Sequence, residues 1–259
     1  MSRFINLEFS DESGEQQQSG AKPLVKDEAF YMAEARTAFE EGNHEQGLRF
    51  YSKVLEFNPK NSAAWTGQVR MLIELGEFRE AKLWADKALE RFPNEPELLA
   101  AKGVALGRSG DLQGALAFSD AAIEERGDTP YIWLARGDVL LSRSEHRADY
   151  CFEKAVLLAP RDWFTLLLAA RIRMYYEQFV LALKLLQQAV EQNSSHFLLW
   201  LEKGNCQQAL GMIGAAEYSF KQAQQLNPQS QEVGLALVQI GRTGWLTRMR
   251  DKVGKIFKR

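Results

Sequence analysis

The chain repeats itself with a period of thirty-four residues, and this period constrains the fold more than any other feature. A small residue recurs at steps of 34, 34, 33, 34 and 34, at Gly47, Ala81, Ala115, Ala148, Ala182 and Ala216. A second set follows seven residues later, at Val54, Ala88, Ala122, Ala155, Ala189 and Ala223. A third set lies twelve residues earlier, or eleven in the fourth copy, at Ala35, Val69, Gly103, Gly137, Ala170 and Gly204. Antiparallel helices approach closely only where the facing side chains are small, so each copy is predicted to be a pair of helices.

Large residues and turn residues keep the same period. Bulky side chains fill the spaces between the predicted helices, at Tyr31, Trp65, Trp133 and Trp200 on first helices and at Tyr51, Phe152, Leu186 and Phe220 on second helices. Helix-stopping residues predominate at the end of each copy, at Pro59, Pro93, Gly127, Pro160, Ser194 and Pro228. The turn within each copy often requires a left-handed backbone, and it holds Gly42, Gly76, Gly110, Ser144, Glu177 and Gly211.

With these spacings the chain resembles the tetratricopeptide repeat family. The resemblance implies an all-α protein, a right-handed superhelical solenoid of about six helix-turn-helix repeats with a C-terminal capping helix. It covers residues 28–230, with repeats at 28–61, 62–95, 96–129, 130–162, 163–196 and 197–230. It also implies that the first helices line a concave groove in which ligands dock.

Composition agrees with a folded helical protein. Hydrophobic residues make up 46% and charged residues 25% of the 259 residues, and strong helix formers dominate the repeats. The formal net charge is −2, so the body of the chain offers no general attraction to nucleic acid, and a nucleic-acid partner is disfavoured. We find no signal peptide and no stretch near the roughly 20 apolar residues of a membrane span. A cytoplasmic protein is therefore expected.

No catalytic or metal-binding pattern is present in the sequence. His44, His146 and His196 fall near turns of different repeats, without the neighbours that a catalytic triad requires. Cys151 and Cys206 fall in predicted helices and lack metal-ligand spacing, so they are expected to be buried thiols. The chain is predicted to be a non-enzyme without cofactors or metal.

The predicted binding residues lie on one stripe of the first helices, where side chains three or four apart share a face. They are Arg36, Arg70, Arg108, Tyr131, Leu134, Asp138, Leu141, Phe164, Leu167, Arg171, Tyr175, Leu201 and Asn205. An apolar stripe that faces water indicates a protein partner, which we expect to be a peptide or an amphipathic helix with acidic residues. The alternative is that Leu134, Leu167 and Leu201 pack between neighbouring repeats. The leading hypothesis is a protein–protein interaction scaffold or adaptor.

The flanking segments carry separate expectations. Residues 1–27 open with the apolar residues Phe4, Ile5, Leu7 and Phe9 and then pass through a polar stretch, so we expect a disordered segment with a linear motif. Residues 231–241 are expected to form a helix that caps the last repeat. Residues 242–259 hold seven basic residues against one acid, so the rest of the chain sums to −8. We expect the two end segments to differ: the first to be mobile and the last to dock as a helix.

The last segment predicts a basic amphipathic helix. Its candidate contact residues are Trp245, Leu246, Met249, Arg250, Lys252, Val253, Lys255, Ile256 and Phe257. It could dock on the array as a degenerate seventh helix pair, although Arg250 stands where the repeat needs a small residue. It could also bind an anionic membrane, a partner protein or nucleic acid. The alternative function is therefore a membrane-surface recruitment factor, peripheral at a membrane. The sequence does not define the partner's identity or the oligomeric state.

Overall fold

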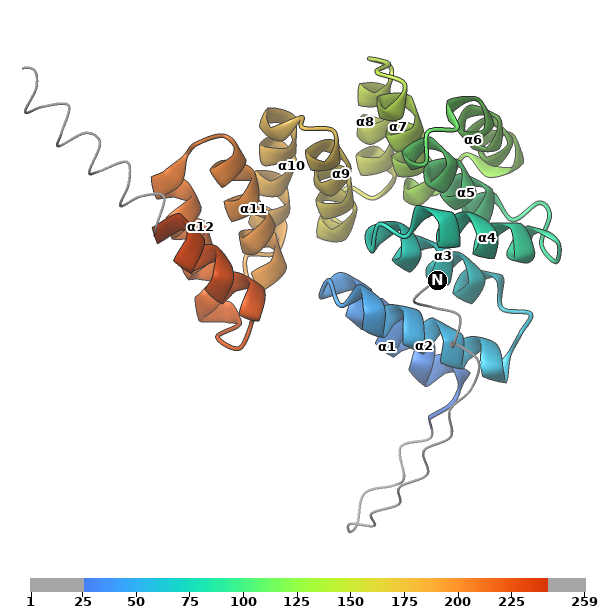
Figure 1. Cartoon of the computed structure of the whole chain (residues 1–259), viewed down its shortest axis with the longest axis horizontal. Helices are drawn as coiled ribbons and strands as arrows, with labels where there is room; N and C mark the ends of the chain where they lie inside the picture. The colour runs from blue at the N-terminus through green and yellow to red at the C-terminus, as the bar shows by residue number, and fades with distance from the viewer. Residues whose placement is uncertain (1–25, 242–259) are drawn as a thin grey trace, which may run out of the picture. The chain divides into compact units, whose positions relative to one another are not determined.

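The computed structural model describes residues 26–241, which are built from helices and contain no strand (Figure 1). The expectation of an all-α solenoid of tetratricopeptide-like repeats is confirmed. Twelve helices are followed by a helical stretch at residues 231–241, which runs to the end of the described part. The twelve are α1 (Glu28–Glu40), α2 (His44–Phe57), α3 (Ser62–Glu74), α4 (Phe78–Leu89), α5 (Pro96–Arg108), α6 (Leu112–Arg126), α7 (Pro130–Ser142), α8 (Ala148–Leu158), α9 (Trp163–Tyr175), α10 (Phe179–Gln192), α11 (Phe197–Ala209) and α12 (Ile213–Leu226).

Most helices pack most closely against their partner within one copy of the period, as α9 does with α10 and α11 with α12, whereas α3 contacts α2 and α4 about equally (Figure 1). The small residues of the period lie at these contacts, and the alanines among them are almost fully inaccessible to solvent. Glycines on first helices accept a ring from the second helix. An ideal Cβ on Gly137 would lie 2.8 Å from Phe152 Cζ, and one on Gly204 would lie 2.5 Å from Phe220 Cδ1. Small residues therefore set the spacing of the pairs.

The turn within each pair adopts a left-handed backbone in all six copies. The four glycines have φ between 74° and 94°, whereas Ser144 and Glu177 have φ of 57° and 59°. This region costs an L-residue with a side chain about 1–2 kcal/mol. The fourth and fifth turns therefore keep the fold's geometry with residues that are less suited to it.

Tryptophans link consecutive copies through one repeated hydrogen bond. The indole Nε1–H of Trp65 donates to the carbonyl of Pro59 at 3.1 Å. Trp133 donates to Gly127 at 2.7 Å, and Trp200 donates to Ser194 at 2.8 Å. Each acceptor is the helix-stopping residue six positions earlier. The bond supplies a donor to a backbone carbonyl in the connection between two copies, where no helical N–H is available to bond it.

The chain divides into two compact units, with the boundary between Pro93 and Asn94, and each is described by itself. The first unit holds α1 to α4. The second holds the remaining helices, and its larger core cluster extends from α9 to residues 231–241, with Leu167, Leu186 and Phe220 fully buried. None of the described helices is both long and apolar enough to cross a membrane.

Candidate protein-binding face

The second unit sets its first helices, α5, α7, α9 and α11, next to one another in chain order. Eleven of the thirteen residues predicted to form the binding stripe lie on these four helices. Five of the eleven are buried in the described structure: Leu134, Asp138, Leu141, Leu167 and Leu201. The packing alternative therefore holds for the leucines, which are not open to a ligand.

Asp138 is the centre of a buried ion-pair network that joins three repeats. Its Oδ2 lies 2.6 Å from Arg108 Nη2 on α5, and Arg108 Nε donates to the same oxygen at 3.1 Å. The Tyr176 hydroxyl, just after α9, donates to Asp138 Oδ1 at 2.8 Å. The Arg108 and Asp138 side chains are only 9% and 3% exposed. Burial, and secondarily the Asp138 carboxylate, raises the pKa of Tyr176 well above that of an ordinary tyrosine, so the phenol stays a donor.

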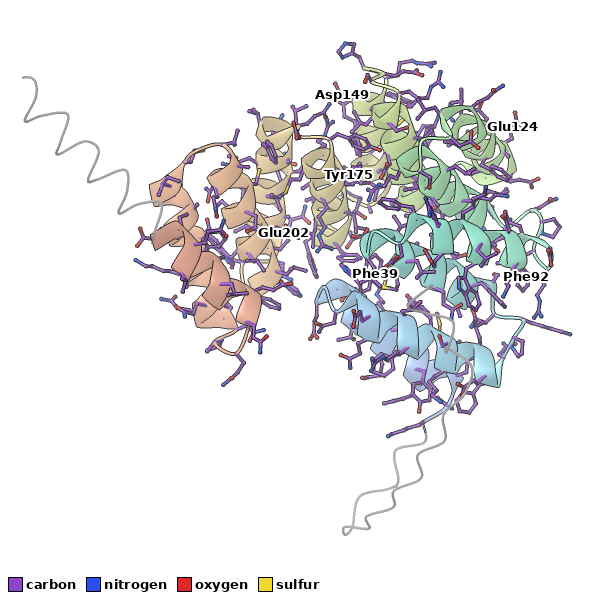
Figure 2. All side chains as sticks on the ribbon, in the orientation of Figure 1. Phe39, Phe92, Glu124, Asp149, Tyr175 and Glu202 are labelled. Carbon is purple, nitrogen blue, oxygen red and sulfur yellow. The ribbon has the colours of Figure 1, made fainter. Side chains whose placement is uncertain are left out.

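Tyr175 is the most exposed large hydrophobic residue on the first helices of this unit, α5, α7, α9 and α11. It ends α9 (Figure 2), and its side chain is 49% exposed. Its ring centroid lies 4.2 Å from Arg108 Cζ and 5.0 Å from the ring of Tyr176 in an edge-on arrangement. Since Arg108 is held by Asp138, the exposed ring rests on an ordered support. Tyr175, Arg108 and Asp138 are among the residues predicted from the sequence, and Tyr176 is not.

Arg171 and Glu202 form a second link between first helices. Arg171 Nε on α9 donates to Glu202 Oε1 on α11 (Figure 2) at 2.7 Å, with both side chains mostly buried. Arg171 is among the residues predicted from the sequence, and Glu202 is not. In both links an arginine and an acid on successive first helices lie about one period apart, at 30 and 31 residues. This spacing is the signal that could have indicated them.

The remaining predicted residues of this unit are partly or fully exposed. Tyr131 and Phe164 are partly exposed near the starts of α7 and α9, and Asn205 is exposed on α11. A helix of thirteen residues is about 18 Å from end to end, so Tyr131 and Phe164 lie at one end of the row and Tyr175 at the other. We call Tyr131, Phe164, Tyr175 and Asn205, with Arg108 and Arg171, the first-helix face.

The two predicted residues of the first unit have local partners. The side chain of Arg36 is 77% exposed and lies 2.9 Å from Glu40 one turn later. The guanidinium carbon of Arg70 lies 5.0 Å from the ring centroid of Phe39. They belong to a separate unit, so the candidate site is built from the second unit alone.

A hollow of about 510 Å³ lies within the second unit, between α8, α9 and α10. It follows the shortened fourth copy, where α8 contacts α9 sparsely although α10 packs broadly against α11. Leu157 and Leu181 are exposed at its rim, and Phe152 lies in its wall. Two of its lining residues form an ion pair, in which Nη2 of buried Arg173 donates to Asp149 Oδ1 at 2.8 Å. The binding residues predicted from the sequence lie on first helices only, so none of them lines this hollow.

Chemistry-bearing groups are scattered elsewhere in residues 26–241. No cluster of three or more His, Cys, Asp or Glu side chains in this part could hold a metal ion. Burial raises the pKa of the Cys151 and Cys206 thiols to about 11. The predicted tail contacts, Trp245 to Phe257, lie outside the described residues, as do Phe4 to Phe9.

Paired helices with small residues at their contacts, repeated along the chain, define a helical repeat protein. A family model described as Tetratricopeptide repeat matches residues 5–150, and a second of the same description matches residues 167–231. The first alone spans more than half of the 259 residues. The chain belongs to the tetratricopeptide repeat family, whose members in general are non-catalytic scaffolds for protein–protein interactions.

Solved structures share the fold at low sequence identity. A tetratricopeptide repeat protein from Parabacteroides merdae has a TM-score of 0.53 at 17% identity, covering 82% of this chain and 84% of that one. The Cut9-Hcn1 hetero-tetramer of APC/C has a TM-score of 0.51 at 15% identity, covering 83% of this chain and 43% of that one. The human IFIT1 dimer with PPP-AAAA has a TM-score of 0.50 at 19% identity, covering 86% of this chain and 58% of that one. This chain thus spans about half the length of the last two. No curated protein matches it significantly.

Proposed function

We propose that this protein is a non-catalytic adaptor that binds a peptide segment of another protein on the first-helix face. The observation that carries the proposal is Tyr175, a large ring about half exposed on an ordered support. Aromatic residues held rigidly at a surface give large contact area at little entropic cost, which is why they dominate binding energy at protein interfaces.

The charges of the face suggest the chemistry of the segment. Arg108 and Arg171 are each paired with an internal acid, so their charges are offset within the protein. We therefore expect apolar and aromatic side chains of the partner to supply most of the affinity, with acidic groups secondary. Tyr131, Phe164 and Tyr175 offer contacts at both ends of α9, so a segment lying across α7, α9 and α11 fits this arrangement.

Selection from a displayed library of 16-residue random peptides against the full chain tests the proposal. Enriched peptides should lose affinity about tenfold or more when Tyr175 is replaced by Ala, since truncating an aromatic hot-spot residue costs about 2 kcal/mol. Asn205→Ala should have a smaller effect. Leu181→Ser, at the exposed rim of the hollow, is the matched control and should leave affinity unchanged.

Thermal unfolding of each variant distinguishes lost binding from lost folding. Peptides that fail only with Leu181→Ser would move the site to the hollow between α8 and α10. A library that yields no binder would count against a peptide-binding function altogether.

The membrane-recruitment alternative depends on residues 242–259, outside the described part of the chain. It stays a prediction, and co-sedimentation with anionic vesicles, with and without these residues, tests it.

A further inference from the structure

Residues 231–241 occupy the place of the first helix in a seventh copy of the period. Val233 and Ile240 are almost fully buried, and they lie 34 residues after Leu199 and Cys206, which are also buried. This face of residues 231–241 joins the core cluster of the second unit. The period therefore continues past the six predicted repeats for at least one more helix.

The opposite face of the same stretch is apolar and open. Leu235 is 71% exposed and Val238 is 56% exposed. One period earlier, Leu201 is 4% exposed, and Gly204 is so close to Phe220 that an added Cβ would overlap the ring. An added Cβ on Gly234 or Gly241 would meet no atom within 4 Å. In the sixth copy the second helix, α12, covers this face at Gly204. Within residues 26–241 no second helix covers Val238, the equivalent position of the seventh copy.

The usual spacing from the first helix to the buried residues of the second helix does not give a suitable second helix in the seventh copy. In the sixth copy the buried second-helix residues lie 12, 16 and 19 positions after Gly204, at Ala216, Phe220 and Ala223. The same steps from Val238 reach Arg250, Gly254 and Phe257. A basic residue would then stand at the tightest point of the helix contact, which is the objection to a seventh pair.

The fourth copy provides a shorter spacing that brings an apolar residue, larger than alanine, to this position in place of Arg250. Its buried second-helix residues lie 11, 15 and 18 positions after Gly137, at Ala148, Phe152 and Ala155. The same steps from Val238 reach Met249, Val253 and Ile256, which are apolar and share one helical face.

A count from the turn of the sixth copy reaches the same residues, with the lost residue falling before the turn. In the fourth copy the loss falls after the turn, because left-handed Ser144 precedes Ala148, Phe152 and Ala155 by 4, 8 and 11 residues. The left-handed Gly211 precedes the three buried positions of the sixth copy by 5, 9 and 12 residues. Gly244 precedes Met249, Val253 and Ile256 by the same steps.

We propose that residues 245–259 form the second helix of a shortened seventh repeat, which turns at Gly244 and covers Leu235 and Val238 with Met249, Val253 and Ile256. Only residues 242–244 separate the two helices, and three residues span at most about 11 Å. The covering segment is therefore present at high effective concentration. The open space at Gly234 and Gly241 accommodates side chains larger than alanine. Lys255 and Lys258 then face solvent, so the outer face of this helix is basic.

Disulfide trapping in the full chain distinguishes the two registers. The test pair is Val238→Cys with Met249→Cys, and the matched pair is Val238→Cys with Arg250→Cys, which the usual spacing would bring together. The position at 238 is exposed, so its substitution leaves the core intact. The rate of disulfide formation in a thiol redox buffer is measured by intact mass, with the parent chain as the control for its native thiols.

The pair that includes position 249 should form at least about ten times faster, because residues 249 and 250 differ by about 100° around the helix. Equal rates would indicate a segment without fixed register and would overturn the proposal. A faster pair at position 250 would establish the usual spacing and overturn it as well. Hydrogen exchange gives an independent result: residues 246–256 should be protected in the parent chain, and rapid exchange there would also refute the repeat.

Discussion

Replacing Gly204 with Ala should destabilise the sixth repeat although alanine is the better helix former. The new Cβ would lie 2.5 Å from Phe220 Cδ1 and nearer still to Cε1. Carbon atoms at optimal separation are about 3.5–4.0 Å apart, so the overlap exceeds about 1 Å. Phe220 is fully buried and belongs to the core cluster, so its ring has no space to move into.

The magnitude follows from two opposing effects. Overpacking a core costs about 1–3 kcal/mol, and Gly→Ala within a helix returns about 0.5–1 kcal/mol. We expect a net loss of about 1–2 kcal/mol, which lowers the melting temperature by roughly 2–8 °C for a chain of this size. Thermal unfolding followed by circular dichroism measures it.

A glycine in the partner helix provides the control. Gly214 lies at the start of α12, and an added Cβ there would meet nothing within 4 Å. Gly214→Ala should therefore be neutral or stabilising. Adding Phe220→Leu to Gly204→Ala should recover part of the loss, because the smaller side chain yields space. Equal stability of Gly204→Ala and Gly214→Ala would show that the glycine does not set the spacing of α11 and α12.

Three further predictions concern the turns, the helix contacts and the thiols. Gly76→Ala should destabilise the fold by about 1 kcal/mol through the backbone alone, because φ is 76° and an added Cβ would meet no atom within 4 Å. Glu177→Gly should stabilise it by a similar amount, because φ there is 59°. Denaturant melts of both variants check this. Ala182→Phe should overpack α9 against α10 and cost about 1–3 kcal/mol or more, which an unchanged melting curve would contradict. Because burial raises the pKa of Cys151 and Cys206 to about 11, both should resist alkylation at pH 8 in the native chain and react once it is unfolded; rapid native reaction would refute their burial.

The sequence predicted the repeat contacts because they depend on residue size at fixed spacing. Gly137, Ala182 and the turn at Gly211 could be placed without coordinates, since each position is repeated in every copy. The left-handed turn extended even to Glu177, where the residue type argues against it. A position that recurs in register keeps the same backbone conformation in every copy. The period therefore predicts the conformation at Glu177 better than the residue type does.

The candidate site could be predicted only in part, because the stripe residues do not share one environment. Leu134 and Leu167 lie on the predicted face but are buried, and a periodic pattern cannot separate a groove from a seam between neighbouring first helices. The pairing of Arg108 with Asp138, and of Arg171 with Glu202, depends on side-chain reach across copies, which spacing suggests but does not determine. The hollow beside α8 arises from a local loss of packing that has no residue signature.

The network at Asp138 connects the stability of the second unit to its proposed binding face. Asp138→Ala should cost about 3–5 kcal/mol, because Arg108 would stay buried without its acid. Glu217→Ala breaks the largely exposed pair with Lys221 and should cost less than about 1 kcal/mol. Arg108→Met combined with Asp138→Leu should recover most of the loss, since replacing both charges leaves none buried. The same double variant removes the guanidinium beneath Tyr175, so peptide affinity should stay reduced after stability returns. Full recovery of affinity would mean that Tyr175 binds without its support, and a small cost for Asp138→Ala would mean that the ion pair is not buried in solution.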